Sequence, residues 1–179
     1  MAILPIRMLG DPVLREPASD VEAFDESLRA LFRDMLETMY EAPGVGLAAP
    51  QVGLSLRFFV YDANDGAGPG AMANPILSEA EGEQDDDEGC LSIPGLYYPT
   101  RRAMRIRATG LDLEGRKISI VGEGLLARIL QHETDHVNGM VFIDRLDDEA
   151  RRQAMAAIRN RELGDRSGGA AQRRRSRSG

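Results

Sequence analysis

Residues 124–137 of the chain read GLLARILQHETDHV, and this stretch predicts the helix around which the fold is organised. Its leucine and isoleucine residues recur at helical spacing, which places the helix in or near the core. His132 and His136 are the only histidines in the chain, and their spacing puts them one turn apart on one helix face. Two imidazoles in this arrangement can bind the same cation.

The pattern His132-Glu133-x-x-His136 predicts a metal site. Buried polar groups without partners destabilise a protein, so two histidines and a glutamate on an apolar helix need a partner, which a metal ion supplies. The alternative is a polar helix face without a ligand, which the apolar flanks of the motif disfavour. Glu133 can approach a water at the metal without ligating the metal, so the motif indicates metal-assisted hydrolysis with Glu133 as general base.

A catalytic site of this kind needs a third protein ligand and an open position. Cys90, the single cysteine, lies in the tight segment Glu88-Gly89-Cys90-Leu91-Ser92, which directly follows an acidic run. A thiolate is a strong donor for a divalent transition metal, and Gly89 allows close backbone approach. A downstream carboxylate such as Glu162 is the alternative, in the manner of many metallopeptidases. The residues favour Cys90 and leave Glu162 open.

The other elements follow from periodicity and turn signals. Asp25 is suited to cap a first amphipathic helix that ends at Pro43-Gly44. Beyond it we predict strands at 57–62, 72–77, 104–109 and 118–121, a surface loop at 78–87, and a last helix from Asp147 to about Leu163. Strands that cluster between helices indicate an α+β fold with mainly antiparallel short-strand sheets. We expect these sheets to pack around the helix that carries the H-E-x-x-H motif.

The bulk properties fit one globular domain. The chain has 179 residues, 42% of them hydrophobic, and we assign residues 1–163 to a catalytic domain and 164–179 to a disordered, Arg-rich tail. A single cysteine excludes a disulfide within the chain. No stretch approaches the roughly 20 apolar residues of a membrane span, and we find no signal-type segment, so we expect a cytoplasmic protein with no membrane partner.

Three segments of the sequence resemble the motifs of peptide deformylases, in the same order. They are GVGLAAPQ at residues 44–51, EGCLS at 88–92 and QHETDH at 131–136. The resemblance spans roughly residues 3–163 and leaves out the C-terminal tail. It implies an enzyme that removes the formyl group from the N-terminal formyl-methionine of newly synthesised polypeptides and releases formate.

The resemblance also implies roles for individual residues. Cys90, His132 and His136 would hold one divalent metal ion, typically Fe²⁺, although Zn²⁺, Ni²⁺ or Co²⁺ can occupy such a site. Glu133 would move the protons of the reaction. The side-chain amide of Gln51 and the backbone N–H of Leu91 would donate to the developing oxyanion.

The substrate would lie as an added strand against the backbone of Gly46. Its methionine side chain would occupy an apolar pocket near Val45, Leu126, Ile129 and His132. Glu88 is expected to pair with Arg102 and so to anchor the cysteine segment.

Two other functions are weighed against this one. The first is an H-E-x-x-H metallopeptidase with a carboxylate as third ligand, and the second is a non-catalytic Cys/His metal-binding module associated with the ribosome. Glu133, Gln51 and the glycine segment argue against the second. The net charge is −7, but the chain ends in the basic sequence QRRRSRSG, residues 172–179. This tail is interpreted either as solvated or as an element that, with the C-terminal helix, contacts the ribosome.

Overall fold

The computed structural model describes residues 2–175, and the side chains up to Arg161. The chain divides into two compact units, Met1–Arg145 and Leu146–Gly179, which are described separately. The elements of the first unit are α1 (Glu26–Glu41), β1 (Gly46–Ala48), β2 (Phe58–Tyr61), β3 (Gly70–Glu81), β4 (Gln84–Cys90), β5 (Ile93–Arg102), β6 (Arg105–Leu111), β7 (Lys117–Glu123) and α2 (Gly124–Val137). Short 3₁₀ turns lie at Pro12–Leu14, Ala49–Val52 and Phe142–Arg145.

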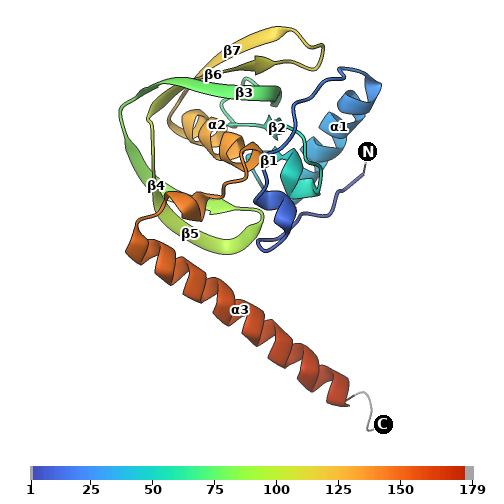
Figure 1. Ribbon diagram of the computed structural model, residues 1–179, viewed down its shortest axis with the longest axis vertical. Coiled ribbons are helices and arrows are strands. Elements are labelled where there is room, and N and C mark those ends of the chain that lie inside the picture. Colours follow the sequence, from blue (N-terminus) through green and yellow to red (C-terminus); the bar gives the residue numbers. More distant parts are fainter. Residues whose placement is uncertain (1, 176–179) are drawn as a thin grey trace. The chain divides into compact units, whose positions relative to one another are not determined.

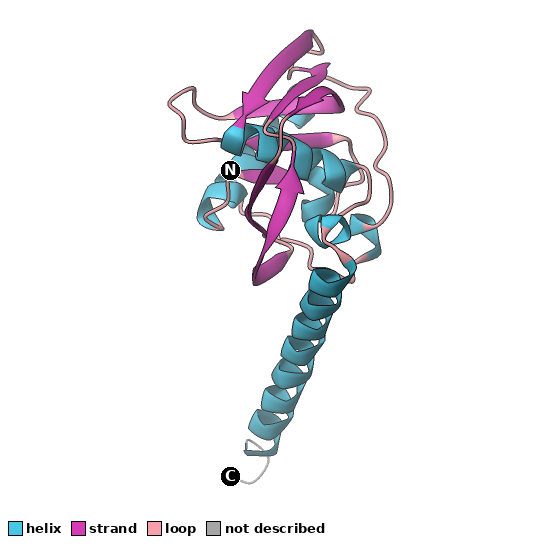
Figure 2. Cartoon of the chain, turned by 90° about the vertical axis from the view of Figure 1, so that its left-hand side faces the viewer, coloured by secondary structure: helices cyan, strands magenta, loops and turns pink. Residues whose placement is uncertain are grey.

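The strands form two antiparallel sheets. Five strands pair in the order β1-β2-β3-β6-β7, and β4 pairs with β5 as a separate hairpin. Helix α2 contacts the five-stranded sheet and also reaches β5. Figure 1 shows α2 in the middle of the strands, and Figure 2 shows the same unit by type of element. The predicted α+β fold with antiparallel sheets around the H-E-x-x-H helix is confirmed.

Helix α1 forms where the sequence predicts it. The carboxylate of Asp25 accepts hydrogen bonds from the backbone N–H groups of Ser27 and Leu28, which caps the helix. Met35 and Met39 are fully buried in a hydrophobic cluster that also includes Leu47 of β1. Because Leu47 belongs to this cluster, the cluster anchors β1, which follows α1 in the chain.

Helix α2 has two different faces. Ala127 and Leu130 are fully buried in a second hydrophobic cluster with residues of the five-stranded sheet. Arg128 and Asp135, which lie seven residues apart on another face of the helix, are buried as well, although they are charged. A buried charge is stable only when it is paired, so the second face must meet polar partners.

The predicted surface loop at 78–87 is wrong. Strand β3 continues to Glu81, and β4 begins at Gln84, so most of this segment is paired. One acidic residue of β4, Asp85, lies opposite a basic residue of β5, Arg101, in the ladder. Opposite charges across a ladder favour pairing, and this partner strand was not predicted. The acidic composition of residues 78–87 therefore predicted a loop, whereas the fold has the end of β3 and the start of β4 there.

The second unit consists of helix α3, Asp148–Arg175. The carboxylate of Asp147 accepts a hydrogen bond from the backbone N–H of Ala150, as expected of a cap. The helix continues to Arg175, whereas the sequence placed its end near residue 163 and disorder beyond it. The division into a domain of residues 1–163 and a tail stays a prediction, and residues 176–179 lie outside the described part. Within the described residues, no helix combines the length and apolar character needed to cross a membrane.

Candidate metal centre

Three potential ligands meet between β4 and α2. The Sγ atom of Cys90 lies 3.3 Å from Nε2 of His136, and the Nε2 atoms of His132 and His136 are 3.2 Å apart. All three donor atoms lie within 4.8 Å of one another. Ligand atoms about 2.0–2.3 Å from a tetrahedral metal are separated by about 3.3–3.6 Å, so this spacing fits one cation. The side chain of Glu162, the alternative third ligand, lies outside the described residues.

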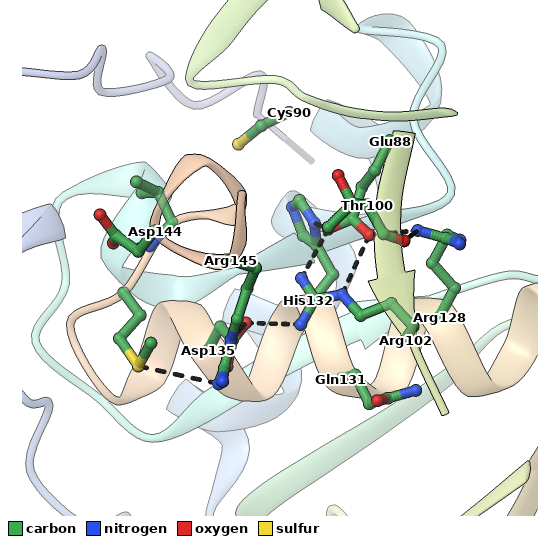
Figure 3. A network of polar contacts seen from close by, with 12 residues as sticks. Glu88, Cys90, Thr100, Arg102, Arg128, Gln131, His132, Asp135, Asp144 and Arg145 are labelled. Atoms are coloured by element: carbon green, nitrogen blue, oxygen red, sulfur yellow. Dashed lines mark hydrogen bonds and ion pairs between the residues drawn. The ribbon is translucent and has the colours of Figure 1, made fainter. Parts of the chain in front are cut away.

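Glu88 orients the first histidine. Its Oε1 atom lies 2.6 Å from Nδ1 of His132, and this contact leaves Nε2 of the ring facing the other two donors. A carboxylate behind a ligating histidine fixes the ring and its tautomer. The predicted pair with Arg102 is present, because Nη2 and Nε of the guanidinium donate to the two oxygens of Glu88 at 2.6 and 3.0 Å. Figure 3 shows this network.

The charge of Glu88 is maintained by its partners. Burial alone would raise the pKa of this carboxyl, but the hydrogen bonds from His132 and Arg102 hold it well below its ordinary value. Arg128 adds a second guanidinium contact at 2.6 Å. Glu88 is thus a buried anion whose negative charge lies directly behind a metal ligand.

Glu133 has a different environment. Burial raises the pKa of its carboxyl to about 7, the range that suits a group that exchanges protons near neutral pH. Its Oε2 atom has no hydrogen-bond partner within the described part of the chain. A Cβ atom built on Gly46 would lie 2.2 Å from Oε1 of Glu133, so only glycine leaves room for the carboxylate. The carboxylate of Glu133 in α2 can therefore occupy its position only because residue 46 in β1 is a glycine.

Gln51 is buried beside the cysteine. Its Oε1 atom accepts a hydrogen bond from the backbone N–H of Ala48 at 2.9 Å, which fixes the orientation of the amide. The Nε2 atom therefore faces Cys90 Sγ at 3.5 Å and Ser92 Oγ at 3.2 Å. The structure thus directs an amide donor toward the ligand cluster.

A cavity of about 520 Å³ opens onto these groups. Val45, Gly46, Leu91 and Ile129 line it, together with Gln51, Cys90, His132 and Glu133. Leu126, which the sequence analysis placed in the methionine pocket, is not part of the lining. Leu126 packs against the second hydrophobic cluster, and its neighbour Leu125 lines the cavity instead. Successive residues on a helix point about 100° apart, so the choice between two adjacent leucines requires the helix orientation.

Sequence reasoning missed the role of Arg128. This residue lines the cavity and is buried against Glu88. It lies four residues before His132, so helical spacing alone puts the two side chains on one face. That spacing is the signal that could have pointed to Arg128.

The site can now be compared with known proteins. A family model described as polypeptide deformylase matches residues 3–152. The chain belongs to the polypeptide deformylase family. This deformylase is 57% identical over 162 residues to the peptide deformylase of Acidothermus cellulolyticus. The matched region covers 90% of this chain and 89% of the relative.

Solved structures agree with this deformylase in fold. The peptide deformylase of Legionella pneumophila has a TM-score of 0.84 and 45% identity, covering 92% of this chain and 98% of that one. The peptide deformylase of Synechococcus elongatus, solved in complex with actinonin, has a TM-score of 0.83 and 40% identity, covering 90% and 89%. The deformylase removes the N-formyl group from nascent peptides, and Cys90, His132 and His136 form the metal site typical of its family.

Proposed function

We propose that this chain hydrolyses the formamide of N-terminal formyl-methionine, with the formyl group beside Cys90, His132 and His136. The observation that carries the proposal is the convergence of these three donors with a buried carboxylate and a buried amide in one cavity. In the reaction the oxygen of water joins the formyl carbon, the C–N bond breaks, and formate and a free amine leave.

We assign Fe²⁺ to the site, with Zn²⁺, Ni²⁺ or Co²⁺ as other ions that one thiolate and two imidazoles accept. When bound, the metal supplies a Lewis acid that polarises the formyl carbonyl and lowers the pKa of water. Sulfur and imidazole ligands support a transition metal over Mg²⁺ or Ca²⁺, which prefer oxygen.

Glu133 is the proton carrier in this proposal. Its carboxylate takes a proton from the attacking water and delivers it to the nitrogen of the leaving amine. A pKa near 7 supports both steps, because the group can hold and release a proton at the same pH. The amide Nε2 of Gln51 and the backbone N–H of Leu91 donate to the oxygen that gains negative charge as water adds.

The substrate backbone lies along β1 in this proposal. Strand β1 is at the end of the five-stranded sheet, so one edge of it is available for pairing. The backbone of Gly46 then pairs with the peptide, as in other cases of strand addition. Val45 and Ile129, with Leu125 in place of Leu126, line the space for the methionine side chain.

The proposal is tested by anaerobic purification, metal analysis and a formate-release assay on formyl-Met-Ala-Ser. We expect about one transition metal ion per chain, predominantly iron, and release of formate in proportion to free amine. An internal peptide bond cleaved in place of the formamide would favour the metallopeptidase alternative. Metal retention without any formate would favour the non-catalytic module.

We further propose that the enzyme acts in the cytoplasm and contacts the ribosome through α3 and the basic sequence of residues 172–179. The sequence of residues 172–179 supports this, since arginines neutralise RNA phosphates. Deleting residues 165–179 should reduce co-sedimentation with ribosomes at low salt and leave formate release from a short peptide unchanged. Equal co-sedimentation of both forms would contradict the contact.

A further inference from the structure

The hairpin that carries Cys90 lies outside the two hydrophobic clusters of the molecule. β4 and β5 form a sheet of their own. Ile93 and Leu96 of β5 are buried, but no residue of either strand belongs to the two hydrophobic clusters. Two strands alone are marginally stable in water. The hairpin therefore depends on other contacts to keep Cys90 in place beside the histidines.

A row of polar side chains on α2 provides such contacts. Arg128, Gln131, His132 and Asp135 have the spacing i, i+3, i+4 and i+7, so they share one helix face. Gln131 bonds both the N–H and the C=O of Ala103, just after β5, at 3.0 and 3.1 Å. Asp135 accepts from Arg102 at 2.7 Å, and His132 contacts Glu88.

Within this row, Arg128 makes a contact that the others do not. Its Nη1 atom donates to Oε2 of Glu88 in β4 at 2.6 Å and to the carbonyl oxygen of Thr100 in β5 at 2.8 Å. One side-chain nitrogen of Arg128 thus joins both strands of the hairpin. Figure 3 shows Arg128 beside Glu88 and Thr100. The guanidinium is buried, where charge-assisted hydrogen bonds are strong and geometrically demanding.

We propose that Arg128 is a positioning residue that fixes the distance between the thiolate of Cys90 and the imidazoles of His132 and His136. It acts through Glu88, two residues before the cysteine, and through the strand paired with it. Arg102 holds Glu88 from within the hairpin and, through Asp135, also reaches α2, but Arg128 links α2 directly to both strands. The inference rests on the proposed ligation of a metal by Cys90.

The test is Arg128→Met in the full-length, Co²⁺-loaded protein. We expect metal transfer to a chelator at least about tenfold faster than in the unmodified protein, because partners behind the ligands contribute 10–100-fold to metal affinity. We also expect the sulfur-to-cobalt absorption band to shift or weaken. Arg128→Lys keeps the charge and should give a transfer rate between the two.

Arg101→Met is the matched control. It removes one positive charge from the same hairpin, but Arg101 is exposed, and its ion pairs are with Glu83, just before β4, and with Asp85 of β4. Its metal transfer rate and spectrum should match those of the unmodified protein. Thermal unfolding is recorded for every variant, since a purely structural role would lower the melting temperature without changing the cobalt band.

The outcomes distinguish the positioning role of Arg128 from the ligation of a metal by Cys90. An unchanged band and transfer rate in folded Arg128→Met would overturn the positioning role and leave the proposed function intact. If Arg128→Met does not fold, an Arg128→Lys protein with unchanged band and rate overturns the role equally. Absence of any sulfur-to-cobalt band in the unmodified protein would instead refute ligation by Cys90.

Discussion

Replacing Glu133 by alanine should lower kcat/KM for formyl-Met-Ala-Ser by about 10⁴-fold, at the upper end of what a general acid–base group contributes. The effect is large because one carboxylate is assigned both proton transfers. Its burial raises its pKa to about 7, and no other carboxylate in the described residues shares its position against Gly46. The measurement is formate release at matched metal content.

Glu133→Gln is the companion variant. It retains the size and shape of the side chain but cannot accept a proton, so it should be as inactive as the alanine variant. Both should keep the metal, because Glu133 is not among the three clustered donors. Activity within tenfold of the unmodified enzyme in either variant would remove Glu133 from the mechanism.

Replacing Cys90 by alanine should abolish both metal binding and formate release. Loss of partners behind the ligands already costs 10–100-fold in metal affinity, so loss of a ligand should cost more than about 100-fold. Metal content after dialysis against a weak chelator measures this directly. The circular dichroism spectrum should keep its helical signal, because the two hydrophobic clusters do not include Cys90.

Ser92→Ala is a suitable control for Cys90→Ala. Ser92 is buried two residues away and contacts Gln51, but its oxygen is not one of the clustered donors. This variant should retain metal. A Cys90→Ala protein that keeps its metal until Glu162 is also replaced would support the metallopeptidase alternative.

Much of the fold could be predicted from the sequence because the helices carry strong local signals. Asp25 and the bounds of α2 follow from capping and apolar spacing. Two of the candidate donors follow from helical geometry, which fixes His132 and His136 to one face. The residues alone favoured Cys90 as the third donor but left Glu162 open, and the resemblance to peptide deformylases implied Cys90. The distance between Cys90 and His136 required the structure, because they are 46 residues apart.

The errors have a common physical origin in contacts that are distant in sequence. Residues 84–87 of β4 were assigned to a loop because they are polar and acidic and because the partner strand β5 was not foreseen. Leu126 was assigned to the methionine pocket, whereas Leu125 lines the cavity. Periodicity groups residues on one helix face, but it does not show how the helix is rotated relative to the sheet. The predicted pair of Glu88 with Arg102 is present, but the sequence did not reveal that Arg128 and His132 contact the same carboxylate.

The close approach of Gly46 to Glu133 has a consequence for inhibition. Any side chain at position 46 would occupy the space of the carboxylate oxygen, since its Cβ atom would lie 2.2 Å from it. Resistance to a compound commonly arises when an enlarged residue blocks the compound and spares the reaction. A substitution at position 46 cannot confer resistance in this way, because the first added carbon atom already displaces the carboxylate of Glu133. An inhibitor that depends on the bare backbone of β1 would therefore face a surface that cannot mutate without disabling the enzyme.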